Sequence, residues 1–159
     1  MTPLQVLFIC TGNICRSPSA EGVLRHRLAE AGLADRITID SAATHDYHTG
    51  EPPNPRAVRC CAKRGYDLTG LRARRLTRED FENFDVISVM DRGHMEILKS
   101  RCPSGEEHRL KLFLDHAEPP LQGQDVPDPY YGGPEDYEAM LDLIEEGMTG
   151  LLDHLRSRL

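Results

Sequence analysis

The residues best suited to chemistry lie in one segment near the N-terminus, Cys10-Thr11-Gly12-Asn13-Ile14-Cys15-Arg16-Ser17, which has the form C-x5-R-S. A loop of this length can curl so that successive backbone N–H groups converge and bind an anion. Gly12 and Asn13 tolerate the left-handed backbone angles that such a curl requires. Arg16 can hold two phosphate oxygens through its planar guanidinium. The same positive field favours thiolate over thiol at Cys10. The segment therefore predicts a nucleophilic cysteine that faces a bound phosphate.

Two simpler interpretations compete with this prediction. A cysteine at the end of a buried strand is, by itself, usually a small core residue, and a bare C-x5-R match arises easily by chance. Here the loop also contains Gly and Asn, and Ser-Pro follows the arginine at a predicted helix start. A nucleotide-binding Walker motif is excluded, because the loop has no second glycine and no lysine before Ser17.

Strand-like and helix-like segments alternate along the chain and must position this loop. Such alternation predicts a parallel sheet with right-handed crossovers. We therefore expect an α/β fold, a three-layer sandwich with a central four-stranded parallel sheet and helices on both faces, forming one domain over residues 1–159. Ligands of such sheets bind beyond the carboxyl ends of the strands, which places Cys10, Ser41 and Asp91 on one rim. The expected strands are Leu4–Ile9, Arg36–Asp40, Asp85–Met90 and Arg109–Phe113. The expected helices are Ser17–Ala31, Arg56–Arg64, a short one near Thr77–Asp80, Gly93–Ser100 and Pro134–Leu155. Long loops are expected at Ser41–Pro55 and Ala117–Gly133.

Composition and charge limit the kinds of partner and environment that we expect for this protein. The formal charge of −7 gives no general electrostatic support for nucleic-acid binding, and we interpret the basic run Arg72–Arg78 as a solvated face. No stretch approaches the roughly 20 apolar residues that cross a bilayer. Five cysteines without framework spacing suit a reducing cytoplasm. The histidines, including His45 and His48, lack a metal-ligand spacing.

Five segments together resemble one known family. VLFICTGNICRSPSAE (Val6–Glu21) is similar to the signature of the low-molecular-weight protein-tyrosine phosphatases, and so is DPYYG (Asp128–Gly132). Between them, DSAAT (Asp40–Thr44), PNPRA (Pro53–Ala57) and VMD (Val89–Asp91) resemble the family's intermediate landmarks in the same order. The resemblance covers nearly the whole chain.

The resemblance implies hydrolysis of protein phosphotyrosine through a cysteinyl-phosphate. Cys10 would attack phosphorus, Arg16 would bind phosphate and stabilise the transition state, and Asp128 would protonate the leaving oxygen and then activate water. Asp128 could otherwise be a turn residue, since Asp-Pro is common in turns, and we expect Asp125 to be only a loop residue. The scheme implies no metal and no cofactor.

Further residues receive supporting roles from the same resemblance. Ser17 would hydrogen-bond the sulfur, and Ser41 would hold Asn13 in its left-handed conformation. Cys15 would form a protective disulfide with Cys10 under oxidation, although it could equally be a packing residue. The implied substrate-binding residues are Thr11, Gly12, Asn13, Ile14, Cys15 and Ser17 in the loop, with Tyr47, Tyr130 and Tyr131 as aromatic walls.

Three rival functions remain to be separated. A thioredoxin-coupled arsenate reductase needs two further cysteines after the third strand, whereas residues 78–101 contain none and Cys102 stands alone. A protein-arginine phosphatase typically has Thr in place of Ile14. A catalytically inactive phosphotyrosine-binding module would not need Asp128. We therefore expect a cytoplasmic phosphatase, a monomer or weak dimer, that acts on phosphotyrosine-containing proteins and releases inorganic phosphate.

Overall fold

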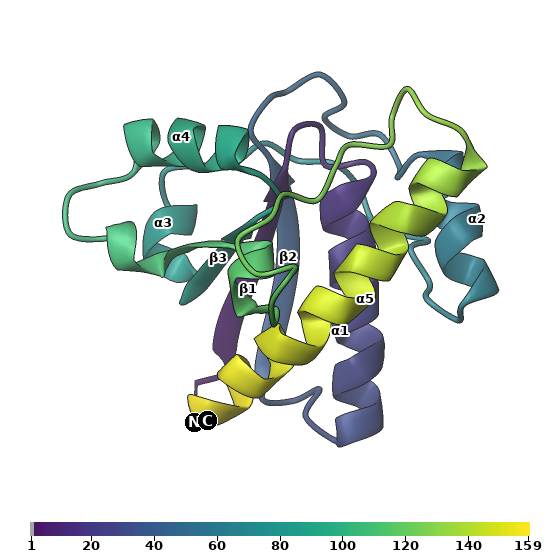
Figure 1. Ribbon diagram of the computed structural model, residues 1–159. Coiled ribbons are helices and arrows are strands. Elements are labelled where there is room, and N and C mark those ends of the chain that lie inside the picture. Colours follow the sequence, from purple (N-terminus) through teal and green to yellow (C-terminus); the bar gives the residue numbers. More distant parts are fainter. Residues whose placement is uncertain (1) are drawn as a thin grey trace.

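Four parallel strands form the central sheet of the computed structural model, which describes residues 2–159 (Figure 1). They are β1 (Leu4–Cys10), β2 (Ile37–Ala43), β3 (Val86–Val89) and β4 (Leu110–Leu112), in the spatial order β2-β1-β3-β4. The central strand β1 pairs with β2 along its whole length, and it pairs with β3 up to the contact between Ile9 and Val89. The carboxyl ends of these strands therefore meet at one rim.

Helices cover both faces of this sheet. Figure 1 shows α1 (Arg16–Ala31) and α5 (Pro134–Ser157) side by side on one face, with α2 (Pro55–Lys63) against α5. The other face carries α3 (Asp80–Asn83) and α4 (Arg92–Arg101). Two short 3₁₀ turns, η1 (Glu107–Arg109) and η2 (Phe113–His116), flank β4.

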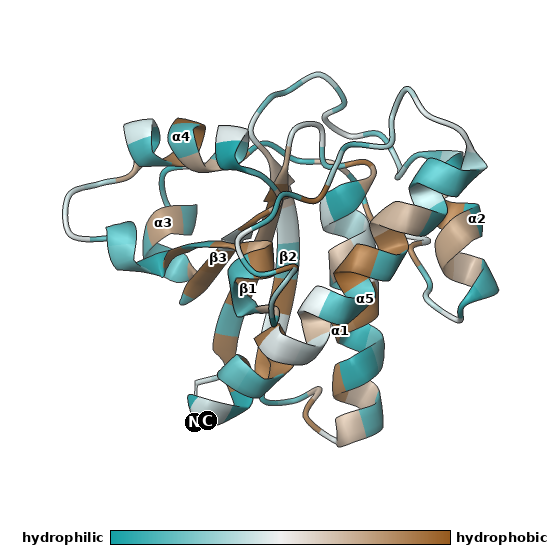
Figure 2. Cartoon of the chain, in the orientation of Figure 1, coloured by the Kyte–Doolittle hydropathy of each residue, from teal (hydrophilic) through white to brown (hydrophobic). Residues whose placement is uncertain are grey.

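Side chains of β1 alternate between two hydrophobic cores, as expected for a strand that is buried on both faces. Val6 and Phe8 point into the core formed with α1 and α5, whereas Leu7 and Ile9 point into the core formed with α3 and α4. In Figure 2 the hydrophobic colour is concentrated in the strands and on the facing sides of α1 and α5. The predicted three-layer α/β fold is thus confirmed.

The second strand is longer than predicted. β2 continues to Ala43, so Ser41 lies within a strand rather than in a loop. The added residues, Ser41, Ala42 and Ala43, are small and have little strand propensity. The extension is stabilised instead by pairing, because Cys10 lies opposite Ala43 and Ala43 also exchanges backbone hydrogen bonds with the segment around Arg75.

The same pairing corrects our interpretation of the basic run. Arg72, Arg75 and Arg78 are exposed, as expected for a solvated face. The expectation was wrong for Arg74, which is half-buried and forms ion pairs with Asp40 at 3.0 Å and with Asp80 at 2.9 Å.

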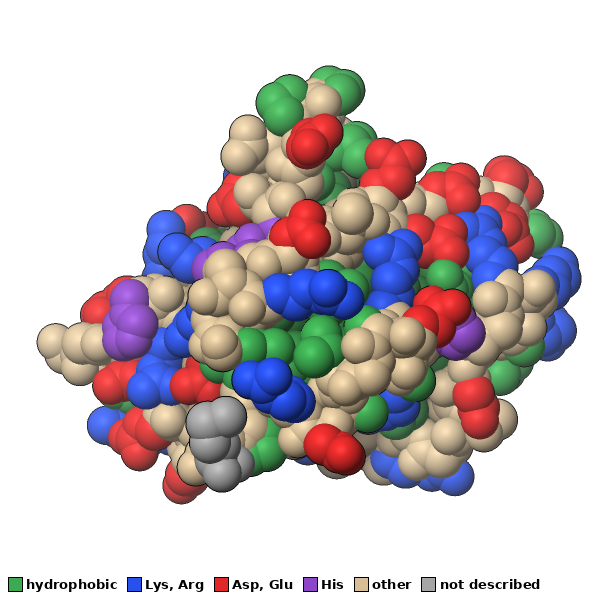
Figure 3. Space-filling view, turned by 90° about the horizontal axis from the view of Figure 1, so that it is seen from below, with side chains coloured by type: hydrophobic (Ala, Val, Ile, Leu, Met, Phe, Trp, Pro, Cys, Tyr) green, Lys and Arg blue, Asp and Glu red, His purple; other side chains and the backbone are tan. Residues whose placement is uncertain are grey.

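The amino ends of the strands lie at the opposite end of the molecule, near the C-terminus (Figure 1). Figure 3 shows this end from below, where acidic and basic side chains surround a hydrophobic area. A hollow of about 360 Å³ opens there between the starts of β1, β2 and β3 and the C-terminus. None of the described residues that line it is a cysteine or a histidine. Within residues 2–159, no helix combines the length and the apolar character needed to span a membrane.

Candidate active site

The predicted anion-binding loop connects β1 directly to α1. Asn13 has a φ of 58°, the left-handed conformation that sequence analysis predicted for it or for Gly12. The loop is tied to its neighbours through its own carbonyl groups. The Thr11 carbonyl accepts from the N–H of His45 at 3.1 Å, and the Ile14 carbonyl accepts from the N–H of Asn54 at 2.8 Å. These bonds leave the loop little freedom to unfold.

A chain of side-chain hydrogen bonds leads from a carboxylate to the sulfur of Cys10. Ser41 Oγ donates to Glu21 Oε1 at 2.7 Å, so it accepts from Asn13 Nδ2 at 2.9 Å. The same amide donates to Ser17 Oγ at 2.8 Å. The Ser17 hydroxyl can then direct its proton to Cys10 Sγ, 2.9 Å away, and the Ser17 N–H also points at that sulfur at 3.4 Å. Two donors therefore converge on Cys10, an arrangement that suits a negatively charged sulfur.

Arg16 is held rigidly behind the loop. It is only 2% exposed, and its Nη1 donates to Asp91 Oδ2 and to the Val126 carbonyl, both at 2.8 Å. Burial tends to raise the pKa of Asp91, but the hydrogen bond from the His94 N–H and the Arg16 guanidinium together hold it below its ordinary value. Asp91 therefore stays ionised and fixes one edge of the guanidinium, while Nη2 lies 3.5 Å from Asp128 Oδ2.

Asp128 lies at the mouth of the site on the loop before α5. Its Oδ1 accepts from the N–H of Tyr130 at 3.0 Å, and its side chain is 47% exposed. Arg56 braces this loop, because its guanidinium donates to the carbonyls of Gly132 at 2.9 Å and Tyr130 at 2.7 Å. One carboxylate oxygen of Asp128 is thus fixed by its own loop, and the other can exchange a proton with a ligand.

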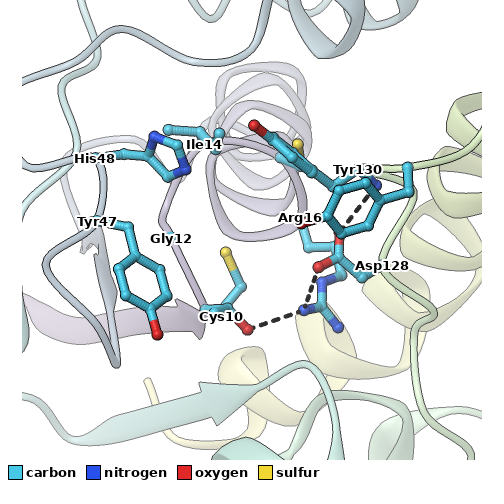
Figure 4. A pocket seen from close by; sticks show the side chains of 11 residues that line it. Cys10, Gly12, Ile14, Arg16, Tyr47, His48, Asp128 and Tyr130 are labelled. Atoms are coloured by element: carbon cyan, nitrogen blue, oxygen red, sulfur yellow. Dashed lines mark hydrogen bonds and ion pairs between the residues drawn. The ribbon is translucent and has the colours of Figure 1, made fainter.

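These side chains enclose a cavity of about 270 Å³ (Figure 4). Cys10 and Arg16 lie at its base, with Tyr47 on one side and Tyr130 on the other. Tyr47 is 68% exposed, and Tyr131, which also lines the cavity, is 96% exposed. The shape fits an anion at the base and a flat aromatic group between the tyrosines, which can stack on it.

Similarity to known proteins agrees with this geometry. The sequence model of the family described as low molecular weight phosphotyrosine protein phosphatase matches residues 5–159. The chain belongs to this family.

Relatives of known name are similar over almost their full length. The low molecular weight protein-tyrosine-phosphatase of Streptomyces coelicolor is 39% identical over 156 residues, which is 97% of this chain and 94% of that protein. The low molecular weight phosphotyrosine protein phosphatase of Sus scrofa is 40% identical over 152 residues, 96% of each chain. The crystal structure of YfkJ from Bacillus subtilis superposes with a TM-score of 0.93 at 34% identity, covering 99% of this chain and 98% of that one.

Most site residues predicted from the sequence of this phosphatase-family member lie around the cavity. Asn13, Ser17 and Ser41 instead lie behind the loop, in the hydrogen-bond chain that ends at Cys10. The predicted residues that line the cavity are Cys10, Thr11, Gly12, Ile14, Cys15, Arg16, Tyr47, Asp128, Tyr130 and Tyr131. Asp125 is not among the lining residues and instead accepts from the Arg92 N–H at 3.1 Å.

Two histidines near the loop were not predicted as site residues. His48 lines the cavity and packs so closely on Gly12 that a Cβ at Gly12 would lie 2.8 Å from His48 Cδ2. His94 contacts both Thr11 and Arg16 from the start of α4. The signal for His94 was its position three residues after Asp91, which follows β3 and accepts from the His94 N–H as a helix cap.

Cys15 lines the cavity but is a poor nucleophile. Burial raises the pKa of its thiol to about 12, and its sulfur lies 3.6 Å from the hydroxyl of Tyr137. All five cysteines are free thiols. The predicted disulfide with Cys10 therefore stays a prediction. Within residues 2–159, no cluster of three or more His, Cys, Asp or Glu side chains could hold a metal ion.

Proposed function

We propose that this protein hydrolyses phosphotyrosine in proteins by two successive displacements at phosphorus. The Cys10 thiolate attacks phosphorus, and the bond from phosphorus to the tyrosyl oxygen breaks while Asp128 donates a proton to that oxygen. Asp128 then takes a proton from water, whose oxygen attacks the cysteinyl-phosphate. The S–P bond breaks, inorganic phosphate is released and the thiolate is regenerated. A positioned acid of this kind contributes typically ~10²–10⁴-fold to the rate.

The observation that carries this proposal is the direction of the groups around one sulfur. Two donors point at Cys10 Sγ from Ser17, and the buried guanidinium of Arg16 and the carboxylate of Asp128 lie in the same cavity. Ser17 stabilises the thiolate as attacking and as leaving group, and Arg16 binds the phosphoryl oxygens on which charge builds up. No step requires a metal or a cofactor, and we propose that the reaction takes place in the cytoplasm.

Aryl phosphates fit the cavity better than phosphoarginine. Ile14 lines the same cavity as the tyrosines and supplies an apolar edge rather than a hydroxyl. A phenyl ring can stack on Tyr47 or Tyr130, whereas a phosphorylated guanidinium would have to place polar N–H groups against this apolar edge.

A metal-free assay tests the reaction and its substrate class. With a chelator present, the wild type should hydrolyse para-nitrophenyl phosphate and a phosphotyrosine peptide but not phosphoarginine. Cys10→Ser should abolish turnover, whereas the matched control Cys102→Ser, at the far end of α4, should retain it. Substantial activity in Cys10→Ser, or a preference for phosphoarginine, would contradict the proposal.

The role of Asp128 is tested by varying the leaving group. Asp128→Ala should lower kcat for phosphotyrosine by about 10²-fold. The loss should shrink for aryl phosphates with acidic leaving groups, because these leave without a proton. An equal loss for all leaving groups would mean that Asp128 acts only structurally.

A further inference from the structure

A buried histidine contacts two residues of the proposed phosphate site, Thr11 and Arg16. His94 is 3% exposed, and its Nε2 lies 2.8 Å from Thr11 Oγ1 and 3.4 Å from Arg16 Nη2. On the other edge of the ring, Nδ1 lies 3.2 Å from Asp91 Oδ1, within ion-pair distance but without hydrogen-bond alignment, and it has no hydrogen-bond partner among the described residues. Asp91, His94 and Thr11 thus form a carboxylate–imidazole–hydroxyl row that ends at the loop.

The neighbours of the two ring nitrogens determine which one carries the proton. A guanidinium has only donors, so the nitrogen facing Arg16 must offer a lone pair. A carboxylate has only acceptors, so the nitrogen facing Asp91 must carry a proton. The opposite tautomer would set N–H against N–H at Arg16 and a lone pair against the Asp91 carboxylate. The proton therefore belongs on Nδ1.

We propose that His94 is a positioning residue of the phosphate site: as the Nδ1–H tautomer, it accepts hydrogen bonds from Thr11 and Arg16 and thereby orients both. The proposal rests on the proposed function, because the phosphate site is the one assigned there. The hydroxyl proton of Thr11 is directed at His94, which leaves Thr11 Oγ1 free to accept from Arg16 Nη2, 3.4 Å away. The Nη2 edge of Arg16 is thus held by His94 and Thr11, while Nη1 is held by Asp91.

The imidazole of His94 must be neutral to accept these hydrogen bonds, and its surroundings favour the neutral form. Burial, and next the positive charge of Arg16, lower the pKa of His94 to about 4, and His45 acts in the same direction. Asp91 and Asp128 oppose this shift but do not overcome it. At neutral pH the Nε2 lone pair is therefore available.

The tautomer can be measured on the wild-type protein without any turnover. Long-range ¹H–¹⁵N correlation spectra distinguish protonated from unprotonated ring nitrogens, and His94→Gln assigns the resonances by their loss. We expect Nδ1 protonated and Nε2 bare for His94 near neutral pH. A proton on Nε2 would overturn the proposal, whether or not the protein proves to be a phosphatase.

Two variants distinguish the effect of the acceptor lone pair on Nε2 from the effect of the ring's bulk. His94→Phe keeps a ring but removes the acceptor, and leaves donors of a buried arginine and a threonine unpaired. We expect inorganic phosphate to bind about ten- to a hundredfold more weakly, with a similar fall in kcat/KM. His94→Gln, whose side-chain carbonyl can reach the position of Nε2, should recover most of both losses.

The matched control is His108→Phe, the same exchange at an exposed residue of η1. It should leave phosphate binding unchanged. Unchanged phosphate binding in His94→Phe, or equal losses in the Phe and Gln variants, would overturn the proposal. If His94→Phe fails to fold, the tautomer of the wild type and the phosphate affinity of His94→Gln still decide it. A wild type that binds phosphate but does not hydrolyse para-nitrophenyl phosphate would refute the proposed function alone.

Discussion

Mild acid should destabilise this protein through His94, and His94→Gln is the perturbation that isolates the effect. The pKa of His94 is about 4 in the folded chain because of burial and Arg16, against an ordinary value of 6.5. Between these values the unfolded chain binds a proton on this residue and the folded chain does not. Falling pH therefore favours unfolding, starting below 6.5 and levelling off below the folded pKa.

The size of the effect follows from the two pKa values. Between about pH 7.5 and about pH 5, this one group should lower the free energy of unfolding by about 2 kcal/mol. With an m-value of roughly 1–3 kcal/mol per molar urea, the urea midpoint should fall by roughly 1 M. Asp91, whose pKa lies below its ordinary value, remains ionised over this range and contributes nothing to the slope.

Urea unfolding of the wild type and the histidine variants at the two pH values measures this fall in the free energy of unfolding. His116, whose pKa is also lowered to about 4 by burial and by His154, should add a smaller fall because it is more exposed. We expect His94→Gln to lose most of the difference between the two pH values, and His116→Gln to lose less of it. A His94→Gln variant that keeps the full acid loss would refute the reasoning, because another group would then bind the proton.

Three further predictions concern other elements. Arg56→Ala should lower kcat for phosphotyrosine by about tenfold, because its two hydrogen bonds brace the loop that carries the acid, and stopped assays with a series of leaving groups should show the largest loss for the most basic one. Gly150→Ala should destabilise the fold by about 2 kcal/mol or more in urea unfolding, since a Cβ there would overlap the carbonyl oxygen of His116; an unchanged midpoint would show that α5 shifts freely. After peroxide inactivation, dithiothreitol should restore most activity to the wild type and little to Cys15→Ser, if Cys15 captures oxidised Cys10 before it reaches irreversible states; equal recovery would make Cys15 a packing residue.

The local geometry of the proposed site was predictable because its parts are consecutive in the chain. The sulfur, the left-handed Asn13 and Arg16 at the first turn of α1 lie within seven residues. Strand and helix periodicity then predicted four parallel strands, whose carboxyl ends share a rim for reasons of topology alone. The tyrosines and Asp128 were predicted from a resemblance between motifs rather than from any physical pattern in the sequence.

The partners that orient these groups were decided by tertiary structure. Arg16 is fixed by Asp91, 75 residues away, and Thr11 by His94, 83 residues away. Periodicity reports which face of an element is buried, but not which polar atom from a distant strand or helix will meet it there. For the same reason Arg74 appeared solvated in the sequence and is paired in the fold, where β2 brings Asp40 beside it. The sequence by itself determined that a thiol, a left-handed turn and a guanidinium stand together in one loop, and only the packing of remote segments decided which polar groups surround them.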